Sequence, residues 1–212
     1  METLLGIALG LGLSAACGFR IFVPLLALGA AEASGHLTLS PGFDWIGSAP
    51  ALVAFGVATA AEITAYYVPW LDNLLDSLAT PAAVVAGTVA TASVVTDMDP
   101  LLRWTLAVVA GGGLAGAVQS STTLLRAAST GSTAGLANPL VATGELGGAI
   151  ALSIAALVVP LLAFAAVIVG LVLAVAWARR RRTARLARAR EAFRTSGLAH
   201  GPGSGESAQQ PW

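Results

Sequence analysis

The chain contains no lysine and few charged residues of any kind. Only 10% of its 212 residues are charged, whereas 56% are hydrophobic, and its mean hydropathy is +0.80. A soluble domain normally carries about a quarter charged residues. This shortage of charge argues against a soluble domain and indicates a chain that lies largely within a membrane.

Cysteine and histidine are also scarce. The single cysteine, Cys17, excludes an intrachain disulfide and any zinc site built from cysteines, and the two histidines, His36 and His200, lie in a predicted loop and in the tail. The sequence has no HExxH, GxSxG, P-loop or GxGxxG motif. We therefore expect a protein that is not an enzyme of the zinc or serine type and that holds no metal and no cofactor.

The first residues lack the basic start of a secretory signal peptide, since they read Met1-Glu2-Thr3. Ser14-Ala15-Ala16-Cys17 follows an apolar run and resembles a lipoprotein cleavage site, so processing stays open as an alternative. We favour the interpretation that residues 1–30 form a retained first membrane span.

The few charges are divided unevenly along the chain. Residues 1–178 hold three arginines and nine acidic residues (−6), and residues 179–212 hold eight arginines and two acidic residues (+6). Arginines beside an apolar run mark its cytoplasmic end, and each contributes about 1 kcal/mol to binding an anionic leaflet. We expect a multi-pass protein of the bacterial inner membrane with a cytoplasmic C-terminus, which binds anionic lipids and no nucleic acid through Arg179, Arg180, Arg181 and Arg182.

Apolar segments predict an all-α, polytopic membrane protein with about five transmembrane helices. The clearest, Leu146–Ala178, has no charged residue and is longer than the ~30 Å core of a bilayer at 1.5 Å per residue. The predicted spans cover residues 3–30, 49–70, 81–96, 101–127 and 146–178. They form a transmembrane domain over 1–178. A basic tail over 179–212 follows, and this tail becomes disordered at its end.

Proline and glycine punctuate these segments. Proline begins four of them, at Ala49-Pro50, Thr80-Pro81, Asp99-Pro100 and Asn138-Pro139, where the first turn of a helix tolerates it. The first and last segments exceed one straight crossing and contain Gly18, Pro24 and Pro160, so we expect at each a broken helix or a half-helix followed by a span, and the second arrangement would raise the count to six or seven.

The connections between spans are short. Residues 31–48 contain Trp45 as an interface anchor, Trp70–Leu78 predicts a short interfacial helix, and residues 128–145 are too polar to face lipid. With the tail in the cytoplasm, five spans place the N-terminus outside, loop 31–48 inside and loop 128–145 outside.

Two segments share a pattern of small residues, GLGLSAACGFR at 10–20 and GLAGAVQSSTT at 113–123. An offset of three spans between them would make an inverted two-helix repeat, as in secondary transporters whose sites lie where broken helices meet. The alternative is that small residues recur because they let membrane helices pack closely.

Two charges lie inside predicted spans. Arg20 follows Cys17 in the first apolar segment, and Glu62 lies in the second. A charge within a bilayer is costly, so each needs a partner or a wet cavity. We predict that Arg20 and Glu62 pair near the midplane, either as part of an ion, proton or anion pathway or as a structural clamp between two helices.

Other polar residues form two groups. Asp72 and Asp76 share one helix face and could bind a hard cation, although a solvated face is the simpler interpretation. The second group could line a site, or could bond its own helix backbone. This group begins after Gln119 and comprises Ser120, Ser121, Thr122, Thr123, Asn138 and Glu145.

The positions of helix starts bear on the charge of a ligand. Helices beginning at Asn138 and at Thr80-Pro81 would direct positive dipole ends toward a cavity. With Arg20 these would suit an anion, whereas Glu62, Asp72 and Glu145 would suit a cation or a coupled proton.

Three stretches resemble blocks of one bacterial membrane-protein family, domain of unknown function 4126: SAACGFRIFVPLLAL, EITAYYVPWLDNLLDSLATPAAVVAGT and STGSTAGLANPLVATGE. The resemblance covers residues 3–175 and leaves out the tail. It implies a multi-span helical membrane protein and supplies no activity or catalytic residue.

From these observations we predict that the protein is a transporter or channel-like protein for a small solute or ion and that it acts as a homodimer. The site would comprise Arg20, Glu62, Asn138, Glu145 and Ser120 to Thr123. The alternative is a non-transporting scaffold that binds a partner protein or anionic lipids through its arginine tail. A lipid-modifying enzyme using Asp72 and Asp76 is a third, weaker hypothesis.

Overall fold

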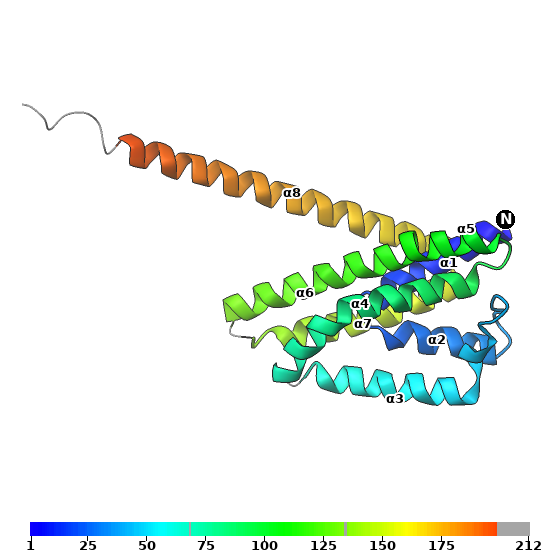
Figure 1. The fold of residues 1–212 in the computed structure, drawn as a ribbon. Helices are drawn as coiled ribbons and strands as arrows, with labels where there is room; N and C mark the ends of the chain where they lie inside the picture. Colours follow the sequence, from blue (N-terminus) through cyan, green and yellow to red (C-terminus); the bar gives the residue numbers. More distant parts are fainter. Residues whose placement is uncertain (68, 134, 199–212) are drawn as a thin grey trace, which may run out of the picture. The chain divides into compact units, whose positions relative to one another are not determined.

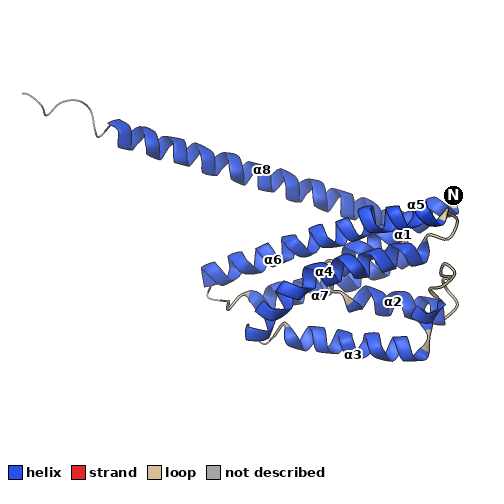
Figure 2. Ribbon diagram, viewed as in Figure 1, coloured by secondary structure: helices blue, strands red, loops and turns tan. Residues whose placement is uncertain are grey.

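The computed structural model describes residues 1–67, 69–133 and 135–198, without the side chains of 69–77, 178, 181–182 and 184–198. Over these ranges all regular structure is helical and no strand occurs (Figure 2), which confirms the predicted all-α class. The elements are α1 (Glu2–Cys17), α2 (Phe22–Ala33), η1 (Asp44–Gly47), α3 (Ala49–Ala65), α4 (Pro69–Val94), α5 (Pro100–Leu106), η2 (Ala107–Gly112), α6 (Gly113–Thr133), α7 (Asn138–Val158) and α8 (Pro160–Leu198).

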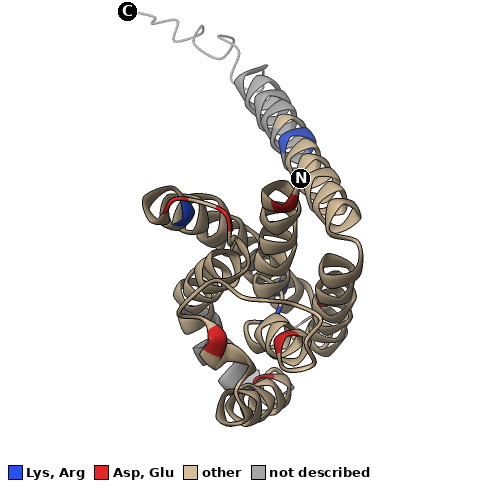
Figure 3. Cartoon of the chain, turned by 90° about the vertical axis from the view of Figure 1, so that its right-hand side faces the viewer, with Lys and Arg blue, Asp and Glu red and all other residues tan. Residues whose placement is uncertain are grey.

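The chain divides into two compact units, unit 1 (Met1–Val167) and unit 2 (Ile168–Trp212). Unit 1 contains α1 to α7 and the first turns of α8. The ribbon of unit 1 carries few charged residues (Figure 3), as expected for helices in lipid. Helix α8 continues from unit 1 into unit 2, through the predicted domain boundary at residue 178.

In the described part of the chain, three helical segments are long and apolar enough to cross a membrane: Pro100–Thr133, Asn138–Val158 and Pro160–Trp177. The chain is therefore a helical membrane protein. Helix α3 and the Leu78–Val94 part of α4 are apolar but shorter, so the count of five spans stays a prediction.

Helices α1 and α2 form a hairpin. They have 16 and 12 residues, which correspond to about 24 Å and 18 Å against a bilayer core of about 30 Å. Gly6 of α1 lies against the Val94 carbonyl, and in the loop after α2 the Ser40 amide donates to the Ser93 carbonyl over 2.7 Å. The start of α1 and the end of α2 therefore lie at the same end of unit 1 (Figure 1).

This hairpin corrects the predicted topology. The sequence reading placed the N-terminus and residues 31–48 on opposite sides, but the chain turns back at residues 18–21, so the two lie together. The connection between α6 and α7 lies at the other end of unit 1 (Figure 1). Helices α3, α4 and α5–α6 run between the two ends.

Most predicted helix boundaries agree with the structure. Helices begin at Ala49, Pro100 and Asn138, and the last apolar segment breaks at Pro160. The Asp99 carboxylate accepts a hydrogen bond from the Leu101 amide over 2.9 Å, which caps the start of α5.

Two expected boundaries are wrong. Pro81 lies inside α4, so Trp70–Leu78 is the first part of that helix and no separate interfacial helix exists. An internal proline costs about 3 kcal/mol, and packing of α4 on α1 and η2 can offset this. The predicted loop 128–145 is mostly helical, because α6 extends to Thr133 and α7 begins at Asn138.

The structure does not confirm an inverted repeat. Ser14 of α1 donates to the Gly111 carbonyl of η2 over 2.5 Å, and Gly18, four residues later, packs against the Ala115 carbonyl of α6. The helices that carry the two similar segments therefore lie side by side and run in the same direction, whereas inverted units would run in opposite directions.

Small residues bring α1, α4 and η2 into close contact. The π-helical segment η2 leaves backbone groups without their usual helical partners, and the Ser14 hydroxyl satisfies the Gly111 carbonyl. On α4, Thr91 donates to the Gly10 carbonyl over 3.2 Å. The interface holds three helices together without any charged side chain.

We predict that Gly111→Ala destabilises the protein whereas Gly113→Ala does not. A methyl group at 111 would collide with Thr91 and would lie 2.9 Å from the Gly87 carbonyl, but at 113 it meets nothing within 4 Å. Overpacking costs about 1–3 kcal/mol, and alanine favours a helix by up to about 1 kcal/mol. Thermal unfolding in detergent measures both variants, and equal losses in the pair would contradict this packing.

Candidate functional site

Arg20 lies at the tip of the α1–α2 hairpin. Residues 18–21 between the two helices are not helical. The Arg20 side chain extends from this turn into the bundle. Its Nη2 donates to the Ala142 carbonyl of α7 over 2.8 Å and lies 3.7 Å from Oε2 of Glu145 on the same helix. The tip of the hairpin is thus anchored to α7.

A second arginine reaches the same carboxylate. Nη2 of Arg126, on α6, lies 3.1 Å from Oε2 of Glu145. Arg20 and Arg126 are each 1% exposed, and Glu145 is 5% exposed. Two buried guanidinium groups therefore share one carboxylate oxygen.

The ring of Tyr66, at the end of α3, contacts both arginines. The guanidinium carbon of Arg20 lies 4.0 Å from the ring centroid, and that of Arg126 lies 4.3 Å away. A guanidinium at this distance from a ring face is attracted by about 0.5–2 kcal/mol, most strongly where water is excluded. Tyr66 thus helps hold two like charges next to each other.

Glu62 of α3 completes the cluster. Its Oε1 accepts a hydrogen bond from the Ile21 amide over 2.9 Å, and its Oε2 accepts one from the Phe22 amide over 3.2 Å. These amides begin α2, where a carboxylate is stabilised by the helix dipole. Glu62 therefore fixes the turn that carries Arg20, and the direct ion pair of Arg20 is with Glu145 in place of the predicted Glu62.

We call Arg20, Glu62, Tyr66, Arg126 and Glu145 the charge cluster. Its two arginines balance its two glutamates, so it is formally neutral. Glu145 lies seven residues after the start of α7 and Arg126 seven before the end of α6, which is about 10 Å of helix. Helix α7 has 21 residues, about 32 Å of helix, so Glu145 lies about 5 Å from the middle of that helix, on the side of the α6–α7 connection.

The serine and threonine residues that were predicted to line a site, Ser120 to Thr123, do not line this cluster. Ser120 donates to the Gly116 carbonyl over 2.7 Å and Ser121 to the Ala117 carbonyl over 2.8 Å, and both residues are exposed. Each hydroxyl bonds the backbone of its own helix, the alternative left open for this stretch.

The neighbouring hydroxyls and Asn138 also form local contacts. Thr122 is buried and donates to the Gln119 carbonyl over 2.9 Å, and Thr123 accepts a bond from the Gln119 side chain over 3.4 Å. Asn138, at the start of α7, donates to the Thr130 hydroxyl over 3.0 Å, which ties α7 to the end of α6.

The side chains of Asp72, Asp76, Arg181 and Arg182 lie outside the described residues. Arg179 and Arg180 are exposed on α8 in unit 2. Among the described residues no group of three or more His, Cys, Asp or Glu side chains could hold a metal ion.

Sequence reasoning missed Arg126 and Tyr66. Arg126 is one of only three arginines before residue 179, and it shares the buried face of α6 with Ala115, Gln119 and Thr122. That helical spacing was the signal available in the sequence. Tyr66 had no comparable signal, because its contacts depend on how α3 packs against the hairpin tip.

We predict that Tyr66→Leu destabilises the protein more than Tyr66→Phe. Phenylalanine keeps the ring face that contacts both guanidinium groups, and leucine removes it, at a cost of about 0.5–2 kcal/mol. Thermal unfolding in detergent, followed by circular dichroism, compares the two. Equal unfolding temperatures would show that the ring contacts contribute nothing to stability.

Comparison with known proteins agrees with this picture. No curated protein and no solved structure matches the chain. One family, described as Domain of unknown function (DUF4126), matches residues 7–180, a range that includes the hairpin from residue 7 onward and every member of the charge cluster. The match confirms the resemblance seen in the three sequence blocks. The chain belongs to the DUF4126 family.

Proposed function

We propose that the protein is a membrane transport protein and not an enzyme, and that a small solute or ion passes through the charge cluster. The observation that carries the proposal is the burial of two arginines and two glutamates at the tip of a broken helix. Ionisable residues within membrane segments usually face a substrate path, because each costs about 2.5–3.5 kcal/mol to place there.

A purely structural role explains the cluster less well. Helices α1, α4 and η2 pack through glycine, serine and threonine, with hydrogen bonds such as Ser14 to Gly111 and no charged side chain. The fold can therefore join membrane helices without paired charges. If helix packing were the only role of the charge cluster, the free-energy cost of burying its charges would not be needed.

The hairpin supports the same proposal. Non-helical backbone at membrane depth is tolerated where it is buried in protein or lines a cavity, and transporters place their sites at such breaks. Here the break at residues 18–21 carries Arg20, and Glu62 stabilises the first amides of α2. The site thus combines a discontinuous helix with balanced buried charges.

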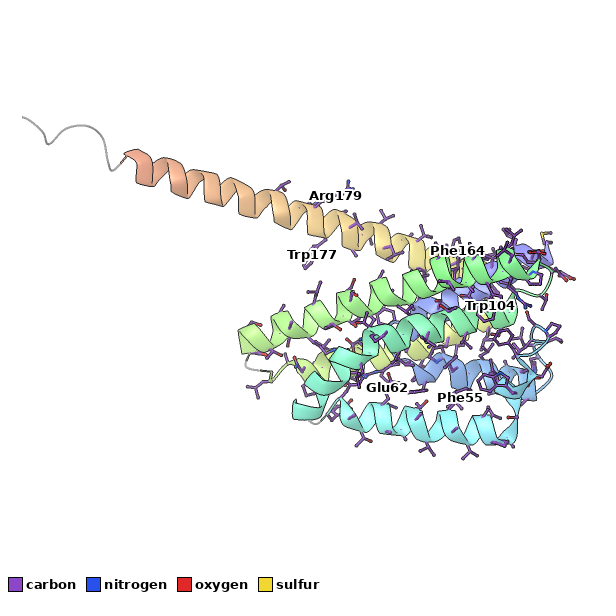
Figure 4. All side chains as sticks on the ribbon, in the orientation of Figure 1. Phe55, Glu62, Trp104, Phe164, Trp177 and Arg179 are labelled. Carbon is purple, nitrogen blue, oxygen red and sulfur yellow. The ribbon has the colours of Figure 1, made fainter. Side chains whose placement is uncertain are left out.

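The scaffold remains the second candidate because of α8. Its apolar part, Pro160–Trp177, is 11% buried within the described structure and is followed by the exposed Arg179 (Figure 4) and by Arg180, which is also exposed. An exposed basic helix next to an apolar one suits an anionic lipid surface or an acidic partner protein. Location in a bacterial inner membrane with a cytoplasmic C-terminus, and a homodimer, belong to both proposals.

Swelling of proteoliposomes tests transport. The solutes are glycerol, urea and, in the presence of valinomycin, the potassium salts of chloride, formate and acetate. We expect at least one of them to enter faster than it enters protein-free liposomes. Arg20→Ala should slow this entry about tenfold or more, because a hydrogen bond from a charged group contributes about 1.5–3 kcal/mol. Arg103→Ala, which changes an arginine outside the cluster, is the matched control.

A chain truncated after Ala178 separates the two candidates in the same assay. Transport requires unit 1 and should survive the truncation, whereas a scaffold acting through its arginines would lose lipid or partner binding. Arg20→Lys keeps the charge and guards against misfolding of the alanine variant. Swelling no faster than in protein-free liposomes for every solute would contradict the transport proposal.

A further inference from the structure

We infer that the charge cluster binds a small anion that bears a carboxylate, and that this group takes the place of the Glu145 side chain between Arg20 and Arg126. The inference rests on the proposed transport function and names its substrate class. It is argued from the geometry of the two arginines, from the donors that Arg20 has to spare, and from the charge of the cluster.

The two guanidinium groups already hold a carboxylate. Nη2 of Arg20 and Nη2 of Arg126 lie 3.7 Å and 3.1 Å from the same oxygen of Glu145, and both groups rest on the Tyr66 ring. The planar fork of a guanidinium matches a carboxylate through paired hydrogen bonds. A substrate carboxylate would meet the same two partners that Glu145 now meets.

Arg20 has donors that the fold does not use. A guanidinium carries five N–H donors, and in the described structure only Nη2 of Arg20 makes a hydrogen bond, to the Ala142 carbonyl. Its Nε and Nη1 are buried without a hydrogen-bond partner among the described residues. A buried donor without a hydrogen-bond partner is costly, and more so on a charged group, so a bound carboxylate would remove this penalty.

Charge balance indicates that a proton accompanies the anion. Among the described side chains, Tyr66 and Glu62 from α3 lie beside the two arginines, Cys17 of α1 lies near Glu62, and the formal charges of the five cluster residues sum to zero with both glutamates ionised. A third carboxylate would add a buried negative charge, which is costly in a membrane interior. Uptake of a proton from water by Glu145 keeps the cluster neutral and releases both arginines to the substrate.

Thermal stability of the purified full chain in detergent tests this, with sodium acetate and sodium formate as probes against equal sodium chloride. A ligand that binds the folded state stabilises it by RT ln(1 + [L]/Kd). Between about pH 6 and pH 8, where acetate stays ionised, the wild type should be stabilised more by acetate as the pH falls. Glu145→Gln mimics the protonated side chain, so its stabilisation by acetate should be large and independent of pH.

Two further variants keep the test decisive. Glu2→Gln removes an exposed carboxylate at the N-terminus and should behave as the wild type. Arg126→Lys keeps the charge but loses the planar fork, and should weaken acetate binding about tenfold or more, because it loses a charge-assisted hydrogen bond. If neither acetate nor formate stabilises the wild type and Glu145→Gln beyond chloride, the inference is wrong.

The outcomes also separate this inference from the proposed function. Stabilisation by acetate without entry of any solute into proteoliposomes would support the carboxylate site and contradict transport. Entry of glycerol, urea or chloride without stabilisation by acetate or formate would support transport and contradict the carboxylate site. Stabilisation by acetate that does not change with pH in the wild type would contradict the coupled proton.

Discussion

The attraction of two buried guanidinium groups to one carboxylate oxygen sets the conditions that the rest of unit 1 must meet. Arg20 and Arg126 repel each other, and in a medium of low dielectric constant this repulsion is large. Glu145 offsets it at 3.7 Å and 3.1 Å, and the Tyr66 ring attracts both cations. The helices that carry these groups must therefore be positioned closely, because a lost partner would leave an isolated charge in the membrane.

The hairpin of α1 and α2 meets this condition by bringing a turn, and not the middle of a helix, to the cluster. Small residues allow α1 to lie directly against α4 and η2, where Gly10 accepts a bond from Thr91 and Ser14 donates to Gly111. Glu62 then satisfies the first amides of α2. Close packing along α1 and a carboxylate at the start of α2 together fix the direction of Arg20, which links the glycine-rich sequence to the chemistry of the site.

Much of this could be predicted from the sequence, and the rest depended on folding in three dimensions. Hydropathy and proline positions predicted the helical class, the break at Pro160 and the start of α7 at Asn138, and the cost of a buried charge pointed to Arg20 and Glu62. The partner of Arg20 and the direction of α2 were not predictable, because a break in an apolar segment is compatible with crossing or with turning back. The helix start predicted at Pro81 was wrong, because packing can keep a proline inside a helix.

The most direct test of the account is the side of the membrane on which the N-terminus lies. Cys17 is buried, so in a Cys17→Ser background Glu2→Cys, Gly42→Cys and Leu136→Cys, all at exposed positions, can be labelled with an impermeant maleimide in spheroplasts and in inverted vesicles. The account predicts that positions 2 and 42 label from one side and position 136 from the other. Labelling of positions 2 and 42 from opposite sides would show that α1 and α2 cross the membrane together, and would contradict the hairpin that places Arg20 in the cluster.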